Sequence, residues 1–205
     1  MRLTDLSRDY EMRDPPWYRM LFANAMMAPL WLIVRTYVGW QWLEAGWHKV
    51  DGDGWINQDG AALRAFWMRI VQVPAQGSPP IRFDWYRDFI QFMLDHHWYT
   101  WFAWVIAFGE VFVGVALIIG LLTGFAALAG ATLNFNFMLA GSASTNPVLF
   151  LLAVLVLLAW KVAGRIGVDR WLLPALGTPW GGNTLLAHQD ARHGGGSPAT
   201  STPRG

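Results

Sequence analysis

The sequence contains no cysteine and few charged residues. Without cysteine, the chain cannot provide thiolates for an iron–sulfur cluster, attach a c-type haem or form a disulfide. Only 14% of its 205 residues are charged and the formal net charge is +1, so no strong field for nucleic acid is present. We therefore expect no nucleic-acid partner.

Two further cofactor signals are missing. All five histidines lie at the ends of apolar segments, in the segment 50–97 or in the C-terminal tail, so none is placed to hold a haem between membrane helices. Gly194–Gly196 stands in a polar tail and does not link a strand to a helix, as a nucleotide-binding glycine motif would. We expect no haem, iron–sulfur cluster or flavin in this chain. We also expect no metal site, because Glu44 and His48 have ligand spacing but no third ligand.

Long apolar blocks are abundant. Hydrophobic residues make up 54% of the chain and gather into four segments, at about 24–47, 98–122, 125–141 and 147–164. Segments of this length and apolarity are typical of membrane-spanning helices. The sequence therefore predicts an all-α integral membrane four-helix bundle in contact with the lipid bilayer.

Charge and composition divide the chain into three parts. Basic residues concentrate before the first span and after the fourth, which predicts that both termini are cytoplasmic in a multi-pass protein. We expect a cytoplasmic N-terminal segment at 1–23, a membrane domain at 24–182 and a disordered tail rich in Gly, Ser, Pro and Thr at 183–205.

The outer loop at 50–97 carries two helical patterns. Residues 61–71 place apolar side chains on one face, and Asp84 is a plausible N-cap for a second amphipathic helix. Both helices are too short and too charged to span a membrane, so we expect them to lie on the outer surface or to cap the bundle.

Arg35, Glu110 and Asn134 interrupt the apolar spans far from their ends. Hydrocarbon cannot solvate such groups, so each must face a partner or a cavity. Arg35 lies twelve residues before Trp47 and Glu110 twelve residues after Trp98, which puts both about 18 Å below the outer surface and predicts an ion pair between them. Two interpretations remain open: a structural pair that fixes helix register, or a polar site for a quinone headgroup or a proton.

A second polar group stands near the outer end of the first span. Glu44 and His48 share one face, and we expect them to form an outer entrance together with Lys49. The alternative is that these side chains have no specific role and are simply hydrated at the membrane interface. In the third span, Asn134 shares a face with Gly130 and Gly141 and is assigned inward, so Asn136 needs a partner from outside the bundle or the membrane boundary.

Three motifs resemble the DoxX family of small membrane proteins, including the small subunits of thiosulfate:quinone oxidoreductases. These motifs are Arg35–Gly39 followed by Glu44–Lys49, then Phe108–Thr123 with Glu110, and Gly167–Asp169. The resemblance implies a bacterial or archaeal inner membrane and a role in quinone-linked oxidation, often of sulfur compounds.

The sequence thus favours a membrane subunit of a quinone-linked oxidoreductase, oxidising a sulfur compound such as thiosulfate, with quinone as the expected ligand. Partner membrane subunits or a homo-oligomer are expected, because the chain has no redox centre of its own. The alternative is a non-catalytic accessory subunit of a larger respiratory or photosynthetic complex. A transporter is disfavoured, because no pair of broken helices is present.

Overall fold

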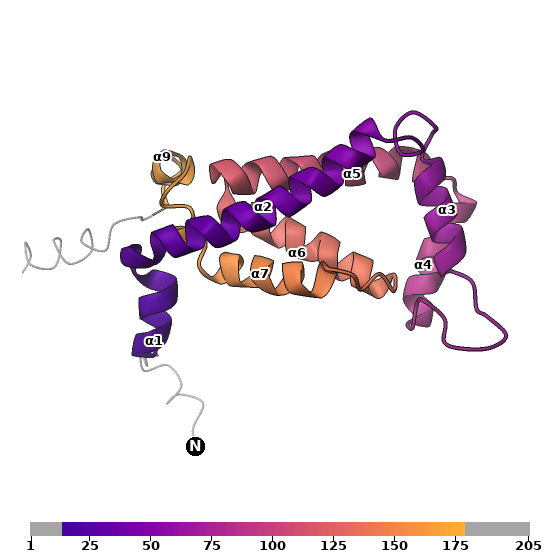
Figure 1. Ribbon diagram of the computed structural model, residues 1–205, viewed down its shortest axis with the longest axis horizontal. Helices are drawn as coiled ribbons and strands as arrows, with labels where there is room; N and C mark the ends of the chain where they lie inside the picture. Colours follow the sequence, from indigo (N-terminus) through magenta and orange to yellow (C-terminus); the bar gives the residue numbers. More distant parts are fainter. Residues whose placement is uncertain (1–13, 179–205) are drawn as a thin grey trace, which may run out of the picture.

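Every regular element in the computed structural model, which describes residues 14–178, is a helix (Figure 1). The predicted tail at 183–205 and most of the predicted N-terminal segment lie outside the described residues. The helices are α1 (Pro16–Tyr18), the π-helical turn η2 (Arg19–Ala23), the 3₁₀ turn η3 (Ala25–Met27), α2 (Ala28–Asp51), α3 (Ala61–Ile70), α4 (Asp84–Asp95), α5 (Tyr99–Ile119), α6 (Thr123–Leu139), α7 (Asn146–Leu158), α8 (Trp160–Ala163) and α9 (Asp169–Ala175).

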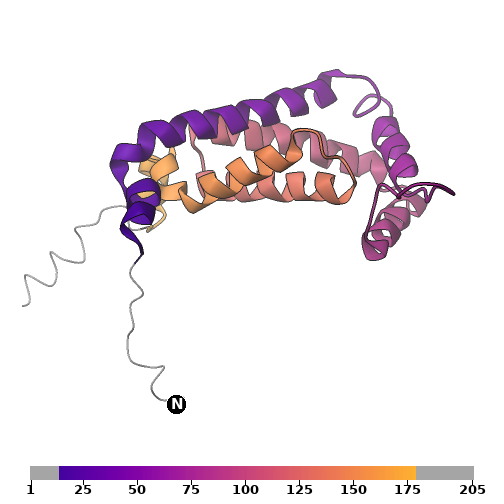
Figure 2. The ribbon, with the colours of Figure 1, turned by 60° about the horizontal axis from the view of Figure 1, so that its bottom comes forward.

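Four helices lie side by side and form the body of the molecule. Helix α2 packs on α5 and α6 on α7, while contacts of α5 with α6 and of α2 with α7 complete the arrangement. Figures 1 and 2 show α1 and α9 at one end of this body, with α3 and α4 lying across the other. The described chain therefore begins and finishes at the end opposite the cap formed by α3 and α4.

Glycines bring α2 and α5 into backbone contact. A β-carbon on Gly39 would lie 2.9 Å from the carbonyl oxygen of Gly114, and one on Gly114 would lie 2.5 Å from the backbone nitrogen of Leu43. A β-carbon on Gly46 would lie 2.6 Å from the nitrogen of Val111. Since only glycine permits this approach, these positions set the register of the two helices.

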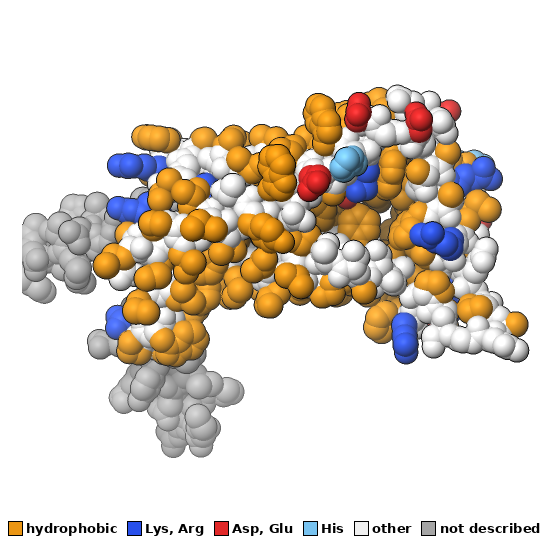
Figure 3. Space-filling model, viewed as in Figure 1, with side chains coloured by type: hydrophobic (Ala, Val, Ile, Leu, Met, Phe, Trp, Pro, Cys, Tyr) orange, Lys and Arg blue, Asp and Glu red, His pale blue; other side chains and the backbone are white. Residues whose placement is uncertain are grey.

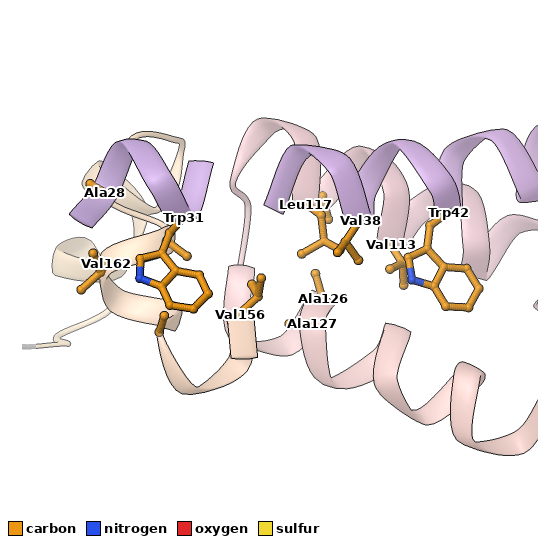
Figure 4. Packing of buried hydrophobic residues seen from close by; sticks show 13 residues of the cluster. Ala28, Trp31, Val38, Trp42, Val113, Leu117, Ala126, Ala127, Val156 and Val162 are labelled. Carbon is orange, nitrogen blue, oxygen red and sulfur yellow. The ribbon is translucent and has the colours of Figure 1, made fainter. Parts of the chain in front are cut away.

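A hydrophobic core fills the space between the four helices. Val38 and Trp42 of α2 meet Val113 and Leu117 of α5, with Ala126 of α6 beneath them (Figure 4). These five side chains are no more than 3% exposed. A second cluster joins the cap to the outer end of the bundle through Leu63, Trp67, Ile70, Ile81, Tyr86, Ile90, Met93, Ala103, Ile106 and Ala140.

The cap differs in one detail from the sequence prediction. Asp84 is the first residue of α4 and not its N-cap, which is Phe83 without a side-chain bond. The Asp84 carboxylate instead pairs with Arg87 one turn later, where it also faces the positive end of the helix. The side-chain amide of Asn136 donates to the carbonyl oxygen of Thr132 in its own helix at 2.8 Å, and the Tyr86 hydroxyl of the cap donates to the backbone carbonyl oxygen of Asn136 at 3.2 Å.

The four predicted spans differ in how well they match a bilayer. Among residues 14–178, α5 alone is long and apolar enough to cross a membrane by itself, and a second candidate arises if Pro16–Ala23 and Ala25–Asp51, bent by 52°, count as one span. Helix α6 has 17 residues and α7 has 13. At about 1.5 Å per residue they reach roughly 26 and 20 Å, short of a core of about 30 Å. Helix α7 is short because the chain breaks at Ala159 before α8.

Candidate functional site

Glu110 forms an ion pair with Lys49 inside the bundle. Nζ of Lys49, near the outer end of α2, lies 2.5 Å from Oε2 of Glu110 in the middle of α5. The Glu110 side chain is 1% exposed and that of Lys49 is 18% exposed. Lys49 therefore reaches inward from the cap end of α2 and brings its charge to a carboxylate that hydrocarbon would not solvate.

The predicted ion pair between Arg35 and Glu110 is wrong. The contact of Gly39 with Gly114 makes these residues level, so in this antiparallel pair Glu110, four residues earlier, is level with Leu43. Arg35 and Leu43 are eight residues apart, or about 12 Å along the axis. The prediction failed because Trp47 and Trp98 do not lie at the same height: α2 continues to Asp51 while α5 starts at Tyr99.

Arg35 belongs to a closed cluster at the opposite end of the bundle. It is 1% exposed, and its Nη2 donates to the carbonyl oxygen of Ile166 at 2.9 Å. A β-carbon at Gly120 would overlap its Nη1, and one at Gly167 would lie 2.8 Å from that atom. Asp169 exerts an electrostatic attraction on the guanidinium. The side chain is thus held between the α5–α6 turn and the segment before α9.

Asp169 ties the C-terminal segment to the start of α6. Its carboxylate accepts hydrogen bonds from the backbone N–H groups of Leu122 at 2.6 Å and Thr123 at 2.7 Å. The backbone N–H of Asp169 donates to the carbonyl oxygen of Gly120 at 2.8 Å. A buried carboxylate at a helix N-terminus satisfies donors that the helix leaves unpaired. Two of the motifs singled out in the sequence therefore contact each other.

Four buried polar atoms near the ion pair have no hydrogen-bond partner among the described residues. They are Nε1 of Trp42, Oε1 of Glu110, and both Nδ2 and Oδ1 of Asn134. Asn134 is fully buried on α6, and a β-carbon on Gly130 would lie 2.9 Å from the Trp42 nitrogen. Buried polar groups are normally hydrogen-bonded, so several such atoms in one place indicate that water or a ligand completes the site.

These atoms belong to residues that line one cavity of about 370 Å³, the polar cavity. Glu44, His48 and Lys49 all line this cavity, and the first two are exposed; their role as an entrance stays a prediction. Figure 3 shows acidic, basic and histidine side chains gathered around a hollow between the bundle and the cap. The full lining is Gln41, Trp42, Glu44, Ala45, His48, Lys49, Glu110, Asn134, Phe137, Ser142, Ser144, Thr145, Asn146 and Leu149.

The sequence prediction places some members of this site and misses others. Glu110 and Asn134 come together with Glu44, His48 and Lys49, whereas Arg35 does not. Among the aromatic residues of α2 and α5, Trp42 lines the cavity. Trp40 is 57% exposed, and Phe108 is 46% exposed and stacks on Trp104 with ring centroids 5.6 Å apart. Trp42 lies four residues after Val38, so the two share one face of α2, and this spacing indicates that Trp42 is buried.

The polar cavity combines hydrogen-bond donors with acidic and basic groups. Trp42 supplies a donor, Asn134 supplies both a donor and an acceptor, and Lys49 supplies a cation. Glu110 keeps one oxygen free while the other binds Lys49. Phe137 and Leu149 add an apolar wall. Such a site suits a small ring that carries carbonyl oxygens and exchanges protons. Among the described residues, no group of three His, Cys, Asp or Glu is placed to hold a metal.

A family model described as DoxX matches residues 30–143, which extend from α2 to the turn after α6 and include Lys49, Glu110 and Asn134. No curated protein matches the chain, and no solved structure does.

Proposed function

Since this chain belongs to the DoxX family of membrane proteins, we propose that it is a membrane subunit of a quinone-linked oxidoreductase and that the polar cavity binds the quinone headgroup. The observation that carries this proposal is the group of unpaired buried atoms on Trp42, Glu110 and Asn134, three residues that line one cavity. Ordinary packing leaves few such atoms in one place.

The donors fit the carbonyl oxygens of a quinone ring. In the proposed complex one carbonyl accepts from the Trp42 N–H, the Asn134 amide or the Lys49 ammonium, and the ring lies against Phe137. A cavity of about 370 Å³ is large enough for a single substituted ring. When bound, the quinone supplies two-electron redox chemistry.

Protons and electrons reach the site by different routes in this proposal. Glu110 holds a proton-accepting oxygen beside the ring, and Glu44 and His48 connect it to the outer aqueous phase. The chain has no cysteine, so electrons come from a partner subunit or directly from a reduced substrate such as thiosulfate. The family supports the membrane location, whereas the sulfur donor rests on the resemblance of the motifs alone.

We further propose that α2, α5, α6 and α7 with α8 each cross an inner membrane, with both termini cytoplasmic. The side-by-side packing of these helices and the basic residues Lys161, Arg165 and Arg170 at the end opposite the cap support this topology. Gln58→Cys, in the loop that leads into the cap, should react with an impermeant maleimide in intact cells. Cysteine introduced at position 170 should react only after lysis, and the reverse pattern would overturn the topology.

Photolabelling tests the headgroup site. An azido-ubiquinone is cross-linked to the protein in lipid nanodiscs, with and without decylubiquinone as competitor, and labelled peptides are mapped by mass spectrometry. We expect competed label on α2 and α6 residues of the polar cavity. Trp42→Phe, which keeps an aromatic side chain but removes the indole N–H, and Asn134→Leu should each reduce it at least tenfold.

Trp40→Phe is the matched control, because Trp40 is exposed on the same helix and lies outside the polar cavity. Its labelling should equal that of the wild type. Label that is spread over the lipid-facing surface, or that is equal in all variants, would overturn the headgroup site.

The accessory role remains the alternative function. An exposed aromatic row on α5, formed by Trp101, Trp104, Phe108 and Phe112, offers a face for a neighbouring membrane subunit or for lipid. Purification in mild detergent separates the two functions. Pigment or cytochrome subunits that co-migrate with a chain lacking competed quinone label favour the accessory role.

A further inference from the structure

A second cavity lies beneath the cap, and its lining is mainly apolar. This cap cavity has a volume of about 300 Å³ and is bounded by Trp67 of α3, Ile90 of α4, Ile106 of α5 and Thr132 of α6, among others. Two of its polar side chains are hydrogen-bonded to backbone. The Tyr86 hydroxyl donates to the backbone carbonyl oxygen of Asn136, and Thr132 Oγ1 donates to the carbonyl oxygen of Leu128 at 2.9 Å. The cavity therefore suits a hydrocarbon group.

Phe137 separates the cap cavity from the polar cavity. Its side chain lines both, and it packs against both hydrophobic clusters of the molecule. On one side, its ring centroid lies 6.0 Å from Nζ of Lys49. On the other side, it stands one residue from Asn136, the partner of Tyr86. One aromatic ring is thus the wall between a polar and an apolar compartment.

We propose that the two cavities form one bipartite site for a quinone with a hydrocarbon tail, with the headgroup in the polar cavity and the first part of the tail in the cap cavity, past Phe137. This inference rests on the proposed function. The lining of the polar cavity includes Ser142, Ser144 and Asn146, whose polar side chains disfavour a hydrocarbon chain. The apolar compartment beside the ring offers the tail a favourable path, because its burial there removes apolar surface from water.

The arrangement also gives the amphipathic cap a role. Helices α3 and α4 turn apolar side chains toward the cap cavity, including Leu63, Trp67, Tyr86 and Ile90. A surface helix in contact with lipid alone would not need to enclose a volume of about 300 Å³ against α5 and α6. In the bipartite site, the cap selects quinones that carry a tail over those that carry none.

Filling the cap cavity tests this inference. Thr132→Phe and Ile106→Phe each add bulk to it from a different helix, so one variant remains informative if the other fails to fold. Leu128→Phe is the control, one turn before Thr132 and outside the cap cavity. Competition against azido-ubiquinone labelling in nanodiscs is measured with decylubiquinone and with the tail-less 2,3-dimethoxy-5-methylbenzoquinone. Partition into lipid is the same for all variants, so changes in the affinity ratio of the two quinones report on the protein.

We expect both filling variants to reduce the preference for decylubiquinone at least tenfold, with the affinity for the tail-less quinone unchanged and Leu128→Phe equal to the wild type. If both quinones compete but the ratio is the same in all folded variants, the tail lies elsewhere and the bipartite site is overturned while the headgroup site stands. If neither quinone competes in the wild type, the proposed function fails as well.

Discussion

Replacing Gly114 with alanine should separate α2 from α5 and weaken the fold that positions the polar cavity. A β-carbon at this position would lie 2.5 Å from the backbone nitrogen and 2.7 Å from the Cα of Leu43, and 2.8 Å from the carbonyl oxygen of Gly39. All three atoms belong to backbone, so no side chain can rotate away. The helices must move apart, and cavities form beside the new methyl group.

The magnitude follows from two opposing effects. Alanine gains up to about 1 kcal/mol over glycine inside a helix. Overpacking of a close contact costs about 1–3 kcal/mol. Gly109 on the same helix isolates the first effect, because a β-carbon there would meet nothing within 4 Å. We expect Gly109→Ala to be neutral or stabilising, and Gly114→Ala to be less stable than Gly109→Ala by about 1–3 kcal/mol.

Denaturant unfolding in mild detergent, followed by circular dichroism, measures both variants on the same scale. Gly114→Ala should also reduce azido-ubiquinone labelling, because a shift of α2 moves Lys49 away from Glu110. Equal unfolding free energies for the two variants would refute the backbone contact between α2 and α5 and, with it, the register that pairs Glu110 with Lys49.

Three further predictions use the same unfolding assay. Lys49→Met should cost about 3–5 kcal/mol by leaving Glu110 buried without a cation, and adding Glu110→Gln should restore part of the loss; additive effects would contradict the ion pair. Asp169→Asn should cost about 1 kcal/mol through a weakened N-terminal cap on α6, and wild-type stability would contradict the capping role. Burial raises the pKa of Tyr86 to about 12 from 10.0, so its contribution to stability is constant below about pH 10 and is lost as the pH rises toward 12. Tyr86→Phe should remove that loss, and an unchanged pH profile would contradict it.

The sequence predicts correctly which polar residues of the helices are buried. It does not predict which of them contact one another. Arg35, Glu110 and Asn134 are each no more than 1% exposed, because an ionisable or amide group within an apolar helix has to turn inward. Which groups meet depends on the register of α2 against α5. That register follows from glycine contacts and from the true helix ends, and a count from aromatic boundary residues placed those ends wrongly.

Other contacts depend on segments that periodicity does not orient. The Tyr86 hydroxyl, which donates to the backbone carbonyl oxygen of Asn136, comes from the cap across a loop containing Gly77, Pro79 and Pro80. The Asp169 carboxylate accepts hydrogen bonds at the start of α6 from Leu122, 47 residues earlier in the chain, and from Thr123, 46 residues earlier. Neither pairing follows from spacing along one helix. The roles assigned to Glu44, His48 and Lys49 stay predictions, although all three now lie on one cavity.

The two buried charged clusters differ in the space that surrounds them. Arg35 has two buried nitrogens, Nε and Nη1, without a hydrogen-bond partner among the described residues, but the glycines at 120 and 167 lie directly against its guanidinium and leave little room for a ligand. Around Glu110, one carboxylate oxygen is unpaired and a cavity adjoins it. A group that must accept a ring and exchange protons needs space and a path to water, which the Glu110 cluster has. Of the two interpretations of the buried charges, the structural one therefore fits Arg35 and the ligand-binding one fits Glu110.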